Sequence, residues 1–71
     1  MKLSIYTLYY NTVEFPEEYI LREWTISSGK QEMGPVVGQG KIRAEVCGGV
    51  EHLEFFARNE YDDPSILGSF L

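Results

Sequence analysis

Stretches of β-branched, aromatic and leucine residues alternate along this chain with polar stretches that contain Gly, Pro or Asn. Residues 2–10, KLSIYTLYY, contain neither Gly nor Pro and predict a strand. Residues 19–26, YILREWTI, alternate with a period of two and predict a second strand. Asn11 and Pro16 lie between the two stretches and are typical of turns, so we expect an antiparallel hairpin.

The first predicted strand has two faces of similar polarity, because side chains alternate between the faces of a strand. One face carries Leu3, Ile5, Thr7 and Tyr9, and the other carries Ser4, Tyr6, Leu8 and Tyr10. One of these faces must cover the core. Tyrosines on the remaining face suit a partly buried surface or an interface, since their rings are apolar and their hydroxyls polar.

The middle of the chain predicts a loop and a helix. Residues 27–35, SSGKQEMGP, are polar with two glycines and a proline, which predicts a mobile loop before a brief strand at residues 36–37. Residues 41–47 predict a short helix that packs on the sheet through Ile42 and Val46, one turn apart. The glycine that follows this segment is a favourable helix stop.

The last third of the chain predicts a second hairpin. Residues 51–57 and 65–71 predict strands, separated by the polar turn of residues 58–64. Gly68 inside the last strand indicates a bulge or the close approach of another backbone. We therefore expect one α+β domain over residues 1–71, a small antiparallel β-sheet of about four strands in two hairpins with one short helix.

The length and the net charge of the chain restrict the classes of function that it can have. With 71 residues the chain forms at most one domain, and a deep active site would use much of its small core. Eleven acidic residues against six basic ones give a net charge of −5, which disfavours direct binding to nucleic acid or to an anionic membrane. One cysteine excludes an internal disulfide, and the N-terminus lacks signal-peptide features, so we expect the cytoplasm, or the host cytoplasm for a phage protein.

The paired carboxylates Asp62 and Asp63 are candidates for acid–base chemistry or for binding a divalent cation. A calcium or magnesium site needs more oxygen ligands at defined spacing than this segment supplies. Aspartates also cap turns by accepting hydrogen bonds from nearby backbone N–H groups, and Pro64 favours a turn here. We expect turn structure and no metal site.

Two further patterns invite a catalytic interpretation. Cys47 and His52 could form a nucleophile and base, but no orienting third group is visible, so we expect Cys47 to be a small buried hydrophobe. Residues 38–40, GQG, lack the GK[ST] ending of a phosphate-binding loop and more simply permit a tight turn. We expect no catalytic residues and no cofactor.

The first hairpin carries more aromatic side chains than a small core requires. Tyr and Trp are the residue types that most often dominate protein interfaces. We expect a monomer that binds a protein partner through this hairpin, with acidic residues and one arginine supplying charge complementarity. The expected contact residues are Tyr6, Tyr9, Tyr10, Glu17, Glu18 and Arg22.

Residues 6–24, 40–50 and 58–71 each carry a short motif of one family. The motifs are Tyr10-Asn11 with Phe15-Pro16 and Tyr19-Ile20-Leu21-Arg22, then Arg43 with Gly49, and then Arg58 with Asp62-Asp63-Pro64. Together they resemble a family of small bacterial and phage proteins, most of which have no assigned activity. The chain departs from this family where Gly68-Ser69-Phe70 replaces acidic and aromatic residues, so the resemblance implies a fold and not a function.

The size, acidity and opening strand are also similar to those of the small transcription regulators of Xanthomonas phages, which bind the host RNA polymerase and suppress initiation. That resemblance implies a non-enzymatic protein that docks on host RNA polymerase and inhibits or redirects transcription. One alternative is an acidic DNA mimic that inhibits a nuclease or restriction system, although the carboxylates are scattered along the chain. The others are a small bacterial domain of unknown function and an enzyme built on Cys47 and His52.

Overall fold

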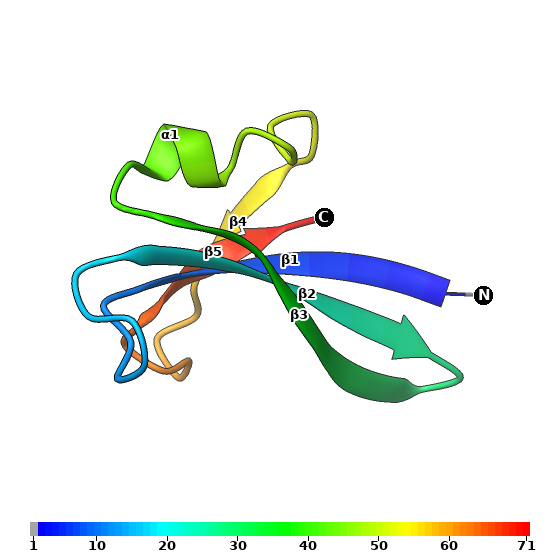
Figure 1. Cartoon of the computed structure of the whole chain (residues 1–71). Helices are drawn as coiled ribbons and strands as arrows, with labels where there is room; N and C mark the ends of the chain where they lie inside the picture. Colours follow the sequence, from blue (N-terminus) through cyan, green and yellow to red (C-terminus); the bar gives the residue numbers. More distant parts are fainter. Residues whose placement is uncertain (1) are drawn as a thin grey trace.

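The computed structural model describes residues 2–71 and contains a five-stranded antiparallel sheet with one short helix (Figure 1). The elements in chain order are β1 (Lys2–Tyr10), β2 (Tyr19–Ser27), β3 (Lys30–Gly40), α1 (Arg43–Val46), β4 (Phe55–Ala57) and β5 (Ile66–Phe70). The strand order in the sheet is β3-β2-β1-β5-β4, which places β1 at the centre. The predicted antiparallel sheet with one short helix is confirmed, but the strands number five rather than four.

The first hairpin forms as predicted. β1 and β2 pair without interruption, from Lys2 opposite Ser27 to Tyr10 opposite Tyr19. The connection between them is closed by a hydrogen bond from the Asn11 backbone N–H to the Glu18 carbonyl, at 3.0 Å. An unbroken run of strand-forming residues on each side of a turn is therefore sufficient to define this part of the fold.

The predicted mobile loop over residues 27–35 is wrong, because β3 begins at Lys30 and continues to Gly40. Ser28 and Gly29 both have positive φ values, 51° and 79°, and so form the two-residue turn that suits a tight hairpin. β3 lies at the edge of the sheet, where the missing N–H of Pro35 is tolerated.

Gly34 allows β3 to cross β2 closely. A Cβ at this position would lie 2.7 Å from the Glu23 carbonyl oxygen, so a side chain here would force the strands apart. The pairing register shifts on both sides of Arg22, which marks bulges in this pair of strands. The Gly and Pro residues that suggested a loop therefore belong to an irregular edge strand.

The helix and the fourth strand are shorter than predicted. The helix predicted over residues 41–47 spans only Arg43–Val46, and the strand predicted over residues 51–57 spans only Phe55–Ala57. The intervening chain forms tight turns, in which the Val50 N–H donates to the Cys47 carbonyl at 3.0 Å. Of the two residues predicted to face the sheet, Val46 is buried, whereas Ile42 has an extended backbone and is 55% exposed.

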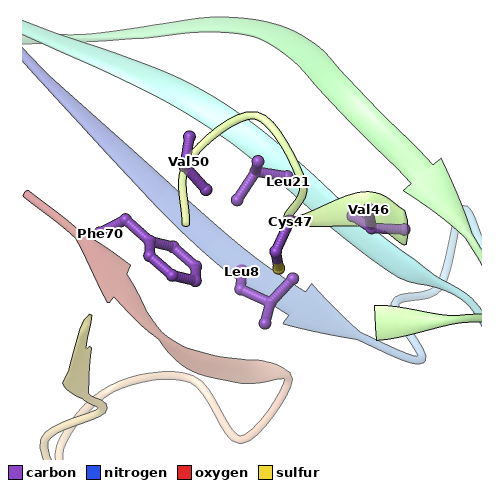
Figure 2. Close-up of a cluster of buried hydrophobic side chains, with 6 residues drawn as sticks. All are labelled: Leu8, Leu21, Val46, Cys47, Val50 and Phe70. Atoms are coloured by element: carbon purple, nitrogen blue, oxygen red, sulfur yellow. The ribbon is translucent and has the colours of Figure 1, made fainter. Parts of the chain in front are cut away.

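The core lies between one face of the sheet and the α1 segment (Figure 2). Its buried side chains come from β1, β2, β5, α1 and the turns after α1, and they are Leu8, Leu21, Val46, Cys47, Val50 and Phe70. The side chain of Leu8 is completely buried at the centre of the sheet. Cys47 is the buried hydrophobe that the sequence predicted.

The two alternatives predicted from Gly68, a bulge or the close approach of another backbone, both occur in β5. The register between β1 and β5 shifts between Leu8 and Tyr9, so β5 carries a bulge beside this glycine. A Cβ on Gly68 would lie 2.5 Å from the Phe56 carbonyl oxygen and would also meet the Phe55 ring. The absence of a side chain at residue 68 therefore lets β4 pack directly on β5.

Candidate functional site: an open face of the sheet

The two faces of the sheet are covered unequally. Leu8 and Leu21 lie opposite each other and contact the α1 segment, and we call their side the helix face. Alternation along the strands points the neighbouring side chains the other way, away from α1. We call that side the open face, which in β1, β2 and β3 consists of Leu3, Ile5, Thr7, Tyr9, Ile20, Arg22, Trp24, Ile26, Gln31, Met33, Val36 and Gln39.

The open face is apolar and nearly free of charge. Cross-strand neighbours make a continuous apolar row, because Leu3 lies opposite Ile26, and Trp24 lies between Ile5 on one side and Met33 on the other. Leu3 and Met33 are 50% and 64% exposed. Arg22 is the one formally charged residue in this set of twelve, although the chain carries a net charge of −5. Exposed apolar patches of this kind mark interaction sites.

A recess of about 210 Å³ lies at one end of the open face. Its lining comes from β1, β2, β3 and the connection between β1 and β2, and consists of Tyr9, Thr12, Glu14, Phe15, Ile20, Arg22 and Met33. The Phe15 N–H donates to the Thr12 side-chain oxygen at 3.1 Å, which holds this connection in place. The recess is smaller than the cavities of roughly 300–1,000 Å³ that hold cofactors or drug-sized ligands, so its volume suits a side chain of a partner.

Arg22 presents a cation in this apolar setting. Its Nη1 donates to the Gly34 carbonyl at 2.7 Å, across the irregular pairing of β2 with β3. A guanidinium has five N–H donors in a planar fork, so further donors remain after this hydrogen bond. Arg22 therefore combines a fixed position with the capacity to bind a carbonyl or carboxylate of a partner.

The three tyrosines predicted from the sequence to contact a partner lie on different faces of the sheet. Tyr9 lies on the open face and lines the recess together with Arg22. Tyr6 lies on the helix face, where its hydroxyl donates to Glu23 Oε2 at 3.3 Å. Tyr10 lies on the same face, with its ring centroid 4.7 Å from that of Tyr19. One flat partner surface cannot contact Tyr6 and Tyr9 at once.

The two selected glutamates lie in the connection between β1 and β2. Glu17 has a φ of 60° and an exposed side chain, and its backbone N–H donates to Asn11 Oδ1 at 2.8 Å. Glu18 Oε2 accepts a hydrogen bond of 2.8 Å from Gln39 Nε2 and so ties this connection to β3. Glu17 is consequently the freer of the two carboxylates for contact with a partner.

The Cys47 thiol is poorly placed for nucleophilic chemistry. Its side chain is only 6% exposed, and this burial raises the pKa of the thiol, an effect that the nearby Arg43 only partly opposes. An activated thiol requires the opposite shift, toward the thiolate. His52 is exposed at the surface, so the pair does not share one environment.

Asp62 and Asp63 stabilise a turn, as predicted. Asp63 Oδ1 accepts hydrogen bonds from the Ser65 N–H and hydroxyl at 2.9 and 2.8 Å, and these bonds lower the pKa of the Asp63 carboxyl. Asp62 Oδ2 accepts a hydrogen bond of 2.9 Å from the Asn59 N–H. Within the described residues 2–71, no three His, Cys, Asp or Glu side chains are grouped so that they could hold a metal ion.

The tight turn predicted at residues 38–40 is wrong, because these residues continue β3. A Cβ on Gly38 would lie 2.7 Å from the Val46 carbonyl oxygen, so this glycine permits α1 to pack closely on the sheet. Residues 38–40 are thus structural.

Most residues of the open face, Met33 and Trp24 among them, are absent from the contact residues that the sequence predicts, as is Phe15 in the recess. The sequence predicts a loop at Met33 and a turn at Phe15, and it places Trp24 in the second predicted strand. The Ser28-Gly29 dipeptide between two strand-like runs is the signal that could have revealed β3 and hence Met33.

Comparison with known proteins identifies no relative of this chain: no family model, curated protein or solved structure matches it. The resemblances described from its motifs therefore remain predictions. Across residues 2–71, no helix has the length and apolar character needed to cross a membrane.

Proposed function

We propose that this chain is a non-catalytic binding protein that docks on host RNA polymerase through the open face and thereby inhibits or redirects transcription. The observation that supports docking is the apolar row of Leu3, Ile5, Trp24, Ile26 and Met33, which α1 leaves uncovered. The choice of polymerase rests on the resemblance of the chain's size, acidity and opening strand to phage transcription regulators.

Two features of the surface suit such a partner. The apolar row and the recess supply buried contact area, and the recess accepts one anchoring side chain beside Arg22. The net charge of −5 attracts the chain to a basic surface of the kind that holds nucleic acid on a polymerase. Occupation of that surface blocks nucleic acid or a transcription factor by steric competition, without any chemical step.

The test is binding of host RNA polymerase to matched surface variants. Met33→Ser removes an apolar side chain that is 64% exposed on the open face, and Ile42→Ser removes one that is 55% exposed beside α1. Truncation of a central contact residue costs about 2 kcal/mol or more, which weakens binding about 30-fold. We expect that loss for Met33→Ser and less than about a twofold change for Ile42→Ser.

The same variants separate binding from transcription. The wild-type chain and Ile42→Ser are expected to lower promoter-dependent transcript yield in vitro, and Met33→Ser is expected to do so only at correspondingly higher concentration. Absence of polymerase binding by the wild-type chain would contradict the choice of partner. Equal binding by both variants would contradict the choice of face.

A further inference from the structure

Arg22 is the one arginine that the fold withdraws from solvent. Of the three arginines in the chain, Arg43 and Arg58 are exposed, whereas Arg22 is half-buried. Within residues 2–71, the guanidinium of Arg22 makes one hydrogen bond, from Nη1 to the Gly34 carbonyl, and no carboxylate is its partner. A cation that is partly desolvated without an anion costs free energy, and a bound carboxylate recovers part of that cost.

The free side of this guanidinium has the shape that binds a carboxylate. Gly34 uses Nη1, so the edge formed by Nε and Nη2 keeps two adjacent N–H donors. A carboxylate accepts one hydrogen bond on each of its oxygens from such an edge, and charge-assisted bonds are about twice as strong as neutral ones. A carbonyl presents only one acceptor atom to the same edge. The geometry of Arg22 therefore favours a carboxylate over a carbonyl.

The walls around Arg22 fit the stem of a side chain. Ile20, Met33 and the rings of Tyr9 and Phe15 line the recess together with Arg22. Apolar walls reduce the screening of a charge pair by water, so they strengthen it. A glutamate side chain has two methylene groups that can lie against these walls before its carboxylate reaches the guanidinium, whereas aspartate has only one. The recess therefore suits glutamate better than aspartate.

Glu14 also lines the recess and opposes a bound anion. Its side chain is exposed, so water and salt screen its charge, whereas Arg22 is half-buried. The attraction of Arg22 for a carboxylate consequently outweighs the repulsion from Glu14. Removal of the Glu14 charge should therefore strengthen the binding of an anion.

The other recesses within residues 2–71 lack a comparable group. One of about 250 Å³ on the helix face is lined by Tyr6, Leu21, Val37, Val46, Gly49 and Val50, and none of these is charged. Another lies beside Asp63 and Pro64, where the Asp63 carboxylate already accepts two hydrogen bonds from Ser65. The recess on the open face is thus the one with an available charge.

We propose that the recess binds a glutamate side chain of the protein partner, with its carboxylate on the Nε–Nη2 edge of Arg22 and its methylene groups against Ile20 and Met33. This inference rests on the proposed function, because it names the residue type that anchors the docked partner. Charged pairs that are desolvated at the centre of an interface are among the contacts whose loss costs most.

A small-molecule titration tests the recess without polymerase. The probe is N-acetyl-glutamate N-methylamide, in which the side-chain carboxylate is the only charge, and the control is the isosteric N-acetyl-glutamine N-methylamide. NMR signals of the Met33 methyl group and the Arg22 Nε–H report binding to the wild-type chain at neutral pH. We expect the glutamate probe to bind at least about tenfold more tightly than the glutamine probe, because only the former makes charge-assisted hydrogen bonds.

A third probe distinguishes the source of the carboxylate. N-acetyl-leucine carries its carboxylate where the C-terminus of a protein does, beside an apolar side chain. We expect it to bind more weakly than the glutamate probe. Tighter binding of N-acetyl-leucine would assign the recess to a chain terminus and overturn the glutamate proposal.

Two charge substitutions in the recess have opposite expected effects on the glutamate probe. Arg22→Gln keeps an N–H donor for the Gly34 carbonyl and is expected to weaken binding at least about tenfold. Glu14→Gln is expected to strengthen binding about twofold, because it removes a like charge. Glu17→Gln is the matched control, since it changes the net charge equally in the same connection but lies outside the recess, and it should have almost no effect.

The outcomes separate this proposal from the proposed function. The recess proposal is overturned if wild type binds the glutamate and glutamine probes equally, a comparison that needs no variant to fold, or if Glu14→Gln weakens binding. If polymerase binds Arg22→Gln as tightly as wild type but binds Met33→Ser weakly, docking on the open face stands and the glutamate anchor fails. If the probes behave as expected but polymerase does not bind wild type, the recess keeps its ligand class and the choice of polymerase fails.

Discussion

The two faces of strand β1 are similarly apolar and differ in what covers them. Leu8 on the helix face is completely buried, whereas Leu3 on the open face of the same strand is 50% exposed. Figure 2 shows that the α1 segment and the turns after it bring Val46, Cys47 and Val50 against Leu8 and Leu21 on the helix face. Similar alternation in a strand therefore serves stability on one face and leaves a surface for binding on the other.

The largest expected effect comes from one substitution made on both faces of β1. Leu8→Ala removes a fully buried side chain and is expected to cost about 2–5 kcal/mol of unfolding free energy, most or all of what a domain this small possesses. Leu3→Ala, on the open face, is expected to cost less than about 1 kcal/mol. Chemical denaturation followed by circular dichroism measures both. Similar losses for the two variants would show that both faces are covered.

The second effect concerns the glycine on which α1 packs. A Cβ on Gly38 would lie 2.7 Å from the Val46 carbonyl oxygen, so Gly38→Ala is expected to displace α1 and to cost about 1–3 kcal/mol. Gly49→Ala is the matched control, because a Cβ there would meet no atom within 4 Å. Thermal unfolding of the two variants measures the difference. Equal midpoints would contradict the close packing of α1 on the helix face.

The smallest expected effect is a change of the unfolding free energy with pH, caused by the buried thiol on the helix face. Burial raises the pKa of the Cys47 thiol in the folded chain, so the unfolded chain loses this proton at lower pH. The contribution of the thiol is therefore complete below its ordinary pKa of 9.0 and is lost as pH rises through the higher folded value. We expect the difference in unfolding free energy between wild type and Cys47→Ala to shrink as pH rises above 9.0. A difference that stays constant or grows would contradict burial of the thiol.

The strands that the sequence predicted well are those whose local signal agrees with their place in the sheet. β1 and β2 contain uninterrupted strand-forming residues and pair in one continuous register. β3 was missed because Gly34 is required by the close approach to Glu23 and Pro35 is tolerated at an edge, so both indicate a loop when read locally. Composition alone does not distinguish an irregular edge strand from a loop.

The candidate site could be predicted only in part. Tyr9 and Arg22 were selected from the first hairpin and do line the recess, whereas Met33 arrives from β3, which the sequence did not reveal. Tyr6 and Tyr10 were selected for the same aromatic character but lie on the helix face. Which face remains open depends on where α1 packs, and that is a property of the tertiary structure rather than of either strand.

Hydroxyl-radical footprinting of the complex with host RNA polymerase tests the docking of the open face most directly. Met33 is 64% exposed on the open face, and Tyr61, in the turn between β4 and β5, is 88% exposed and serves as an internal reference. Both side chains are oxidised readily in the free chain. We expect polymerase to protect Met33 at least about fivefold and to leave Tyr61 unchanged, as burial at an interface would. Protection of Tyr61 with undiminished oxidation of Met33 would contradict docking through the open face.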